Sequence, residues 1–255
     1  MTEILAEKSA GVLRITFNRA DKKNSITAAM YQALADALKD ARGDDAVKVV
    51  LISGSADLFT AGNDLGDFKN NPPSGENAPV FQFLHHVSAC EKPIVAAVGG
   101  PAVGVGTTLL LHCDLVYAAD NARFSLPFTS LGLVPEAASS YLLPQIAGYH
   151  RAAELLLLGE PFGAAKAKEA GFVTEVLPPA QLLEHAAKVA AKLAALPGKS
   201  VRTTKALLKQ AHANHVVNRM KDEGGHFRAM LGEPAAREAF SAFFEKRKPD
   251  FSKCE

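Results

Sequence analysis

The sequence has little of what disulfide-rich secreted proteins and membrane proteins depend on. It contains three cysteines in 255 residues, Cys90, Cys113 and Cys254. Their odd number and wide spacing argue against a disulfide framework and a zinc site, so a reducing compartment fits best. No apolar run approaches the ~20 residues that span a bilayer, and residues 1–10 lack the apolar core of a signal peptide. We therefore expect a cytoplasmic protein that does not enter a membrane.

An excess of charge of either sign is also absent. The chain has 28 Lys and Arg against 27 Asp and Glu, a formal net charge of +1. Such a balance creates no strong field toward nucleic acid or a membrane surface. Hydrophobic residues make up 48% and charged residues 22%, proportions typical of globular proteins that bury a sizeable core. Neither nucleic acid nor a membrane is therefore an expected partner.

Apolar patterning predicts strands that alternate with helices, the arrangement of an α/β protein. Residues 11–17 alternate with period two, and residues 47–53 form an unbroken apolar run typical of a buried parallel strand. Thr27 is placed to cap a helix that ends near Arg42. Further strands are predicted at 94–98, 115–118, 122–125 and 172–176, and further helices at 79–90, 107–112, 135–146, 149–158 and 164–170.

The pattern changes after Pro179 to a series of helical segments. Helical spacing recurs at residues 181–196, 201–211, 216–231 and 235–248. The Pro197-Gly198 pair marks a break between the first of these helices and the rest. We therefore expect a core in residues 1–196 and a separate C-terminal helical region in residues 197–255.

Two glycine-bearing turns, residues 60–64 and 99–106, each lie between a predicted strand and a predicted helix. Each can expose a backbone N–H at the start of a helix, where the peptide dipoles favour negative charge. Two such donors aimed at one point form an oxyanion hole. A plain tight turn accounts for either glycine pattern alone. A nucleotide-phosphate loop is disfavoured, because Leu109 stands where the third glycine of the dinucleotide fingerprint belongs.

Glu136 is a single carboxylate downstream of both turns, at a place where it could act as a base. An acidic residue in the first turn of a helix is also common for electrostatic reasons alone. A helix start at Pro135 favours the ionised form, whereas apolar neighbours such as Leu133, Val134 and Phe128 favour the neutral form. The sequence leaves both directions open for the pKa of Glu136.

Other polar residues favour structural roles. Asp64 is placed to cap the helix after the first turn. Asp114 opens a strand and is expected to make a structural hydrogen bond. His85, His86 and His112 lack partners at metal-ligand spacing, so we expect no metal site.

The order of motifs along the chain resembles the crotonase (enoyl-CoA hydratase/isomerase) superfamily. Residues 58–64 resemble its Phe-Ser-Ala-Gly-x-Asp signature, and residues 92–118 resemble its second signature. The match continues through residues 131–136, 166–173 and 244–247. This resemblance implies a spiral of ββα units followed by a helical region used for assembly into trimers, often paired into hexamers. It also implies acyl-CoA thioester substrates and no cofactor other than the coenzyme A that the substrate carries.

The resemblance also implies roles for individual residues. The oxyanion-hole donors fall on the backbone N–H groups of Asn63 and Val105. The expected substrate contacts are Ala61, Gly62, Asp64, Leu65, Phe68, Gly104, Phe128 and Leu133. The coenzyme A strip corresponds to residues 18–25, with Ala20 in place of the usual proline, and suggests Arg19, Lys22, Lys23 and Ser25. A solvated surface pair accounts equally simply for the two lysines.

Two departures from the family pattern bear on the reaction. Hydratases of the family carry two glutamates, and the corresponding positions here are Thr108 and Phe128. Glu136 instead resembles the lone glutamate of monofunctional, peroxisomal-type 3-enoyl-CoA to 2-enoyl-CoA isomerases. We predict that Glu136 moves a proton from C2 to C4 in an isomerase of unsaturated acyl-CoA that serves β-oxidation or a related catabolic route. The alternatives are a hydratase that recruits Glu136 and a water held elsewhere, and an acyl-CoA-binding protein without turnover.

Overall fold

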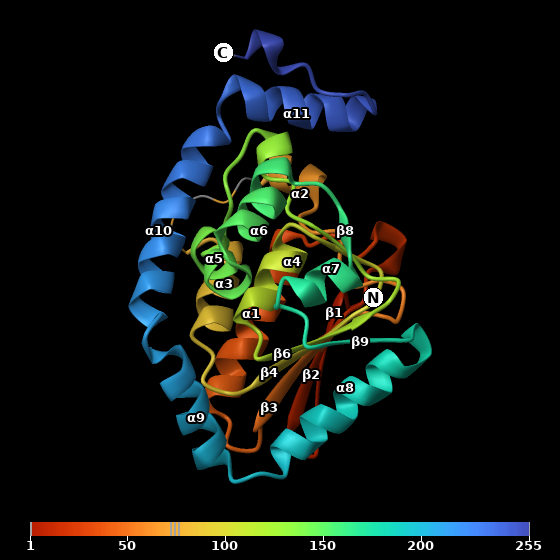
Figure 1. The fold of residues 1–255 in the computed structure, drawn as a ribbon, viewed down its shortest axis with the longest axis vertical. Helices are drawn as coiled ribbons and strands as arrows, with labels where there is room; N and C mark the ends of the chain where they lie inside the picture. The colour runs from red at the N-terminus through yellow and green to blue at the C-terminus, as the bar shows by residue number, and fades with distance from the viewer. Residues whose placement is uncertain (1, 72, 74, 76, 255) are drawn as a thin grey trace.

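Two sheets with helices around them form the fold (Figure 1). The structure is a computed structural model that describes residues 2–71, 73, 75 and 77–254. The larger sheet has the order β1-β2-β3-β4-β6-β9, and β1 pairs antiparallel with β2 while the other neighbours run parallel. Its strands are β1 Ile4–Ser9, β2 Val12–Phe17, β3 Val49–Ser53, β4 Ile94–Val98, β6 Leu115–Ala119 and β9 Glu175–Leu177. The smaller sheet joins β5 Pro101–Val103, β7 Arg123–Ser125 and β8 Phe162–Gly163.

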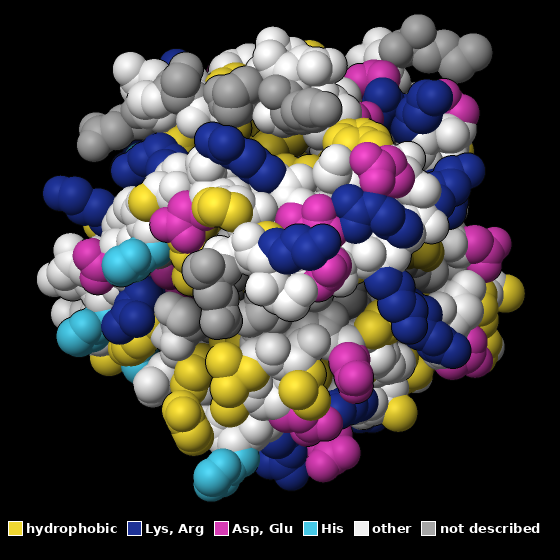
Figure 2. Space-filling model, turned by 90° about the horizontal axis from the view of Figure 1, so that it is seen from above, with side chains coloured by type: hydrophobic (Ala, Val, Ile, Leu, Met, Phe, Trp, Pro, Cys, Tyr) yellow, Lys and Arg dark blue, Asp and Glu magenta, His cyan; other side chains and the backbone are white. Residues whose placement is uncertain are grey.

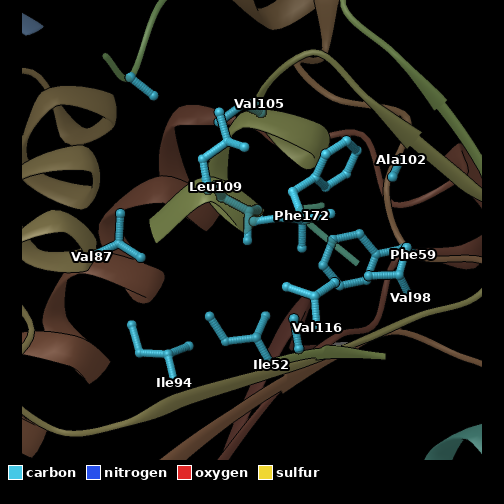
Figure 3. Packing of buried hydrophobic residues seen from close by; sticks show 14 of the residues in the cluster. Ile52, Phe59, Val87, Ile94, Val98, Ala102, Val105, Leu109, Val116 and Phe172 are labelled. Carbon is cyan, nitrogen blue, oxygen red and sulfur yellow. The ribbon is translucent and has the colours of Figure 1, made fainter. Parts of the chain in front are cut away.

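The central strands are almost entirely apolar because helices cover both faces of the sheet. Side chains alternate between the faces of a strand. Val50 and Ile52 of β3 therefore enter one core with helices α1 (Ala28–Gly43) and α3 (Pro79–Ser88), while Val49 and Leu51 enter another with α8 (Pro179–Ala194). Figure 1 shows α8 on the opposite side of the sheet from α1 and α3. In Figure 3, Ile52 rises from the sheet toward the side chains of the first core.

Most of the predicted elements are present, and the differences have local causes. Thr27 caps α1 as predicted, accepting a hydrogen bond from the Met30 amide. The predicted helix at 107–112 is a short α-helix, α4 (Val105–Thr108), that continues as a 3-10 turn. The predicted helix at 149–158 is α6 (Tyr149–Ala153) followed by a π-helical turn, and α7 spans Ala164–Glu169.

The prediction of a helix starting at Pro135 was wrong. The helix, α5, spans Ser139–Ala147. Ala137 and Ala138 have φ angles of 58° and 56°, in the left-handed region that ends regular right-handed structure. Glu136 therefore lies in a turn before the helix and not in its first turn.

The C-terminal helices run along one side of the molecule and across one end of it (Figure 1). They are α9 (Gly198–Gln210), α10 (Ala213–Met230) and α11 (Pro234–Glu245). Lys205 of α9 fixes this region to the core, since its Nζ donates to the Lys92 carbonyl and to Asp114, each at 2.7 Å. Asp114 also accepts from the Ile94 amide, as its predicted structural role requires. Within the described part of the chain, no helix is long and apolar enough to cross a bilayer.

Candidate active site

The two glycine turns pack directly against each other. The Thr60 amide donates to the Pro101 carbonyl at 2.9 Å, and the Val103 amide donates back to the Thr60 carbonyl at 3.1 Å. Gly62 has a φ of 82°, and a Cβ there would lie 2.5 Å from the Val103 carbonyl oxygen. A larger residue would therefore push the two turns apart. The contact fixes the relative position of the helices that follow each turn.

Each turn leaves one backbone amide without an acceptor. Val105 is the first residue of α4, and an amide in the first turn of a helix has no acceptor within that helix. Asn63 lies in a bridge to Ile26 in which the amides of Ile26 and Asp64 make the hydrogen bonds, so its own N–H points away. Among the described residues neither amide has a partner. Both are therefore available to an oxygen of a ligand.

Side chains on both sides hold the first turn in place. The buried Tyr31 hydroxyl donates a hydrogen bond to Asn63 Oδ1. Burial, with the nearby charge of Glu136, raises the pKa of Tyr31 well above its usual value, so the hydroxyl keeps its proton. On the other side Asp64 caps helix α2 (Leu65–Asn70) as predicted and accepts from Arg19 at 2.7 Å. Tyr31 could not be recognised from the sequence, because its contact with Asn63 spans 32 residues.

Glu136 reaches this region through Thr108. The Thr108 hydroxyl donates a hydrogen bond to Glu136 Oε1. Thr108 follows Val105 by three residues in α4, a rise of about 4.5 Å along the helix. The Glu136 carboxyl therefore contacts the same short helix whose first residue is Val105. Thr108 drew notice in the sequence only because it stands where hydratases of the resembled family carry a glutamate. In the structure it is a direct hydrogen-bond partner of Glu136.

The carboxyl of Glu136 titrates in the neutral range. Burial raises the pKa of Glu136 to about 8, the hydrogen bond from Thr108 acts in the opposite direction, and the charge of Glu223 raises it further. The sequence left the direction open, and burial decides it because it is the largest of these effects. A carboxyl with such a pKa can both accept and return a proton near neutral pH.

A cavity of about 1170 Å³ brings together every site residue predicted from the sequence. Its wall contains Glu136, Asn63 and Val105, the eight expected substrate contacts and the four residues of the expected coenzyme A strip. The C-terminal helices close it with aromatic side chains that the sequence analysis missed, Phe227 of α10 and Phe240, Phe243 and Phe244 of α11. The spacing of the last three, at i, i+3 and i+4, marks one face of a helix and is the signal that could have found them.

The four residues of the expected coenzyme A strip differ in whether other side chains already bind them. The Arg19 guanidinium is held by Asp64 at 2.7 Å and by Glu3 at 2.8 Å, and it also donates to Ser25 Oγ. Lys22 and Lys23 are exposed on the cavity wall. Arg19 and Ser25 therefore brace the first turn, while the two lysines are placed to meet an anionic group. Figure 2, which views the molecule from the α11 end, shows basic and acidic side chains interspersed on that face.

A narrower pocket of about 210 Å³ shares Glu136 and Asn63 with the large cavity. It lies between α3 and α10, and its other walls are mostly apolar, including Leu84, Met220 and Phe227. Glu136 thus stands where a wide cavity meets a smaller apolar pocket. Such a site suits a ligand with a bulky polar end and an apolar end, with a reactive group between them.

Metal ligands do not gather at this site. The described residues contain no cluster of three or more His, Cys, Asp or Glu side chains suited to a metal ion. His112, near Glu136 in the fold, is committed elsewhere, since its Nε2 donates to the Ala137 carbonyl at 2.8 Å. Burial lowers the pKa of His112 to about 4, which keeps the ring neutral. The site offers a carboxyl and two amides as its chemical groups.

Comparison with known proteins places this geometry in a family. A model of the enoyl-CoA hydratase/isomerase family matches residues 7–254. The chain is 40% identical over 223 residues to enoyl-CoA delta isomerase 2 of Rattus norvegicus, covering 84% of this chain and 57% of that protein. It therefore spans little more than half of that relative. It is 33% identical over 252 residues to 2,3-dehydroadipyl-CoA hydratase of Escherichia coli (strain K12), covering 98% and 99% of the two chains.

The fold agrees with the sequence comparison. The crystal structure of an enoyl-CoA hydratase/isomerase from Pseudoalteromonas atlantica T6c has a TM-score of 0.94 to this chain at 44% identity. The likeness covers 98% of this chain and 100% of that one, so it includes both the sheets and the C-terminal helices. The family match and the shared architecture lead to one conclusion. The chain belongs to the crotonase (enoyl-CoA hydratase/isomerase) superfamily.

Proposed function

We propose that this chain isomerises 3-enoyl-CoA to 2-trans-enoyl-CoA with Glu136 as its single proton carrier. The observation that carries the proposal is the commitment of the other carboxylates of the large cavity. Asp64 caps α2 and pairs with Arg19, and Asp67 accepts from the Ala28 amide at 2.7 Å. Among the described cavity residues, Glu136 is the carboxyl left for chemistry. A 1,3-proton shift needs one such group, because the proton that leaves C2 returns at C4.

The proposed steps follow from the positions of the three groups. The thioester oxygen accepts hydrogen bonds from the Asn63 and Val105 amides, and Glu136 takes a proton from C2. The electron pair of that C–H bond forms a C1–C2 double bond, and the carbonyl pair moves onto oxygen. The result is a dienolate that keeps its C3–C4 double bond and whose oxygen charge the two amides stabilise. The protonated Glu136 then delivers the proton to C4, and the double bond ends between C2 and C3. No water enters the reaction. Loss of one such oxyanion donor typically costs roughly 10²–10³ in rate.

The positions of Thr108 and Phe128 favour isomerisation over hydration. Hydration uses one group to activate water and another to handle the proton at C2. Thr108 and Phe128, which stand where hydratases of the family carry glutamates, offer no second carboxyl. The rat relative is named an enoyl-CoA delta isomerase, which supports the same choice. The E. coli relative is named a hydratase, so hydration is the alternative that the assay must separate.

The binding mode follows from the two cavities. We place the acyl chain in the narrow apolar pocket between α3 and α10 and the coenzyme A moiety in the large cavity. Lys22 and Lys23 are then positioned near its phosphates.

Assembly into trimers or hexamers remains part of the proposal, as does the division of the chain into a core and a C-terminal region at residue 197. A cytoplasmic location stays a prediction from the cysteine content.

The test compares two substrates and one variant. Purified protein is supplied with 3-hexenoyl-CoA or with 2-hexenoyl-CoA, and products are followed by chromatography and by absorbance of the conjugated thioester. We expect conversion of the 3-enoyl thioester as the main reaction, and a loss of about 10²–10⁴-fold in kcat for Glu136→Gln. Water addition to 2-hexenoyl-CoA as the main reaction would establish a hydratase instead. Unchanged behaviour of Glu136→Gln would indicate a protein that binds acyl-CoA through other groups.

A further inference from the structure

Glu223 is a buried carboxylate in α10, within the region expected to serve assembly. Its described hydrogen-bond partners lie in the core rather than on its own helix. Its Oε2 accepts from the Ala138 amide at 2.6 Å, and its Oε1 accepts from the Ser140 amide at 2.9 Å and from Ser140 Oγ at 2.5 Å. Ala138 and Ser140 follow Glu136 by two and four residues. A helix far along the chain therefore holds the turn that carries the proposed base.

That turn has a conformation that its own sequence does not favour. Ala137 and Ala138 both have left-handed φ angles, which residues with a Cβ rarely adopt. The amides of Ala138 and Ser140 lie at the start of α5, where a helix offers no internal acceptor. Without Glu223 the buried Ala138 amide would have no acceptor, a costly state for a backbone group. The Glu223 carboxylate of α10 thus supplies the hydrogen-bond acceptors that the first amides of α5 lack.

The other contacts of the turn complete its fixation. The amide and hydroxyl of Ser139 donate to the Glu136 carbonyl at 3.0 and 2.7 Å. His112 Nε2 donates to the Ala137 carbonyl at 2.8 Å. These contacts hold carbonyls, whereas Glu223 alone among the described side chains holds the amides of Ala138 and Ser140. Removal of the Glu223 carboxylate therefore frees the amides of the turn, while its carbonyls keep their hydrogen bonds.

We propose that Glu223 is a positioning residue that fixes the turn at Ala137–Ala138 and so aims the Glu136 carboxyl between the two oxyanion amides. The inference rests on the proposed function, because aim matters most for a carboxyl that must serve C2 and C4 from one place. A small rotation of the turn moves the carboxyl away from one of the two carbons. The neighbours of Glu223 in α10, Met220 and Gly224, line the narrow pocket. α10 is then part of the active site as well as of the C-terminal region.

The test compares Glu223→Gln with a matched control in the same region. Glutamine keeps the size of the side chain, but its NH₂ group faces a backbone donor, so one amide of the turn loses its acceptor. Lys205→Met breaks another buried polar contact between the C-terminal helices and the core, and its hydrogen bonds go to the Lys92 carbonyl and Asp114 rather than to the turn at Ala137–Ala138. We expect both variants to lower Tm. Glu223→Gln should lower kcat at least about tenfold with little change in KM, whereas Lys205→Met should keep the kcat of the wild type.

The outcomes separate the inference from the function on which it rests. A wild-type chain without isomerase activity would refute the proposed function. An active wild type with an unchanged kcat in Glu223→Gln, or an equal kcat loss in Lys205→Met, would refute the positioning role. Should Glu223→Gln fail to fold, Ser140→Ala removes one of the three hydrogen bonds and leaves the backbone contacts. It is expected to lower kcat less than tenfold, again with KM retained, and an unchanged kcat would count against the inference.

Discussion

At the scale of single residues, the chemistry depends on how the surroundings of Glu136 set its pKa. Thr108 donates to Glu136 and lowers that pKa, while burial and the charge of Glu223 raise it. The other titratable neighbours, Tyr31 and His112, are neutral near pH 7 because burial shifts their pKa values away from that range. The net pKa of about 8 means that a minority of free enzyme carries the ionised base at pH 7.

Thr108→Val should therefore shift the pH dependence of isomerisation. The variant keeps the shape of the side chain and loses the hydrogen bond that stabilises the carboxylate, so the pKa of Glu136 rises. Because the ionised form is the base, kcat/KM increases with pH through that pKa, and its rising limb should move to higher pH. We expect a several-fold loss of kcat/KM at pH 7 and convergence with the wild type at high pH. A full pH profile of kcat/KM measures both.

The neighbouring threonine provides the control for this variant. The Thr107 hydroxyl is directed to other groups, since it donates to the Ala102 carbonyl at 2.6 Å and to the Ser125 carbonyl at 3.2 Å. Thr107→Val should leave the rising limb at the pH of the wild type. If the rising limb of the kcat/KM profile stays in place or moves to lower pH in Thr108→Val, the hydrogen bond from Thr108 does not lower the pKa of Glu136.

Sequence motifs predicted the proposed reactive groups but not the residues that hold them in place. Glu136, Asn63 and Val105 stand in local patterns that can be recognised within a few residues. Their partners cannot, because Thr108, Tyr31 and Glu223 lie 28, 32 and 85 residues away from the groups to which they bond. Such contacts depend on how distant elements meet, and no local periodicity encodes them. The pKa of Glu136 was left open for the same reason.

At the scale of elements, the sequence predicted the buried strands and the long helices. It did not predict the edge strand β1 or the bounds of the last strand, β9. β3 and β4 are buried at every position, and their short, nearly unbroken apolar runs are typical of strands covered on both faces. β1 was missed because only Ile4 is fully buried in this edge strand, so its alternation is weak. The last strand was predicted at 172–176 and is found at Glu175–Leu177. Phe172 and Val173 are buried in the core without belonging to the sheet. Because they are apolar, the sequence pattern placed the start of the strand too early.

The narrow pocket between α3 and α10 should set the length of acyl chain that the enzyme accepts. Gly224 lines the narrow pocket, and a Cβ there would lie 3.5 Å from Arg228 Nη1 and 4.0 Å from Phe81 Cε1. A leucine at this position extends beyond these contacts and fills part of the 210 Å³ pocket. We expect Gly224→Leu to lower kcat/KM about tenfold or more for long 3-enoyl-CoA substrates and little for short ones. Kinetics over a series of chain lengths measure the difference.

Gly225 is the matched control on the same helix. A Cβ there would meet nothing within 4 Å. Gly225→Leu makes the same change in helix propensity without entering the pocket, so it should keep the chain-length profile of the wild type. Equal losses at all chain lengths in Gly224→Leu would mean that the acyl chain lies elsewhere.

At the scale of the whole molecule, the C-terminal helices have an inner and an outer side that differ in their side chains. The inner side carries Glu223 and Lys205, which bond to the core. The outer side exposes large apolar residues, with Leu207 and Leu208 of α9 at 66% and 75% exposure and Val217 of α10 at 63%. Apolar side chains exposed this far are more common on surfaces that other chains cover. This arrangement agrees with a role of the region in both assembly and catalysis.

Assembly through this face predicts the mass of the protein in solution. Light scattering on the purified chain should give three or six times the 27.0 kDa chain mass. Leu207→Asp combined with Leu208→Asp places two charges where an apolar contact is expected, and burying unpaired charges is costly, so the mass should fall. Gln181→Asp combined with Ala191→Asp adds the same charges to exposed positions of a different helix, α8, and should keep the assembly. A wild-type protein that scatters as a single chain would exclude assembly, and an unchanged mass in the leucine variant would place the interface on another face.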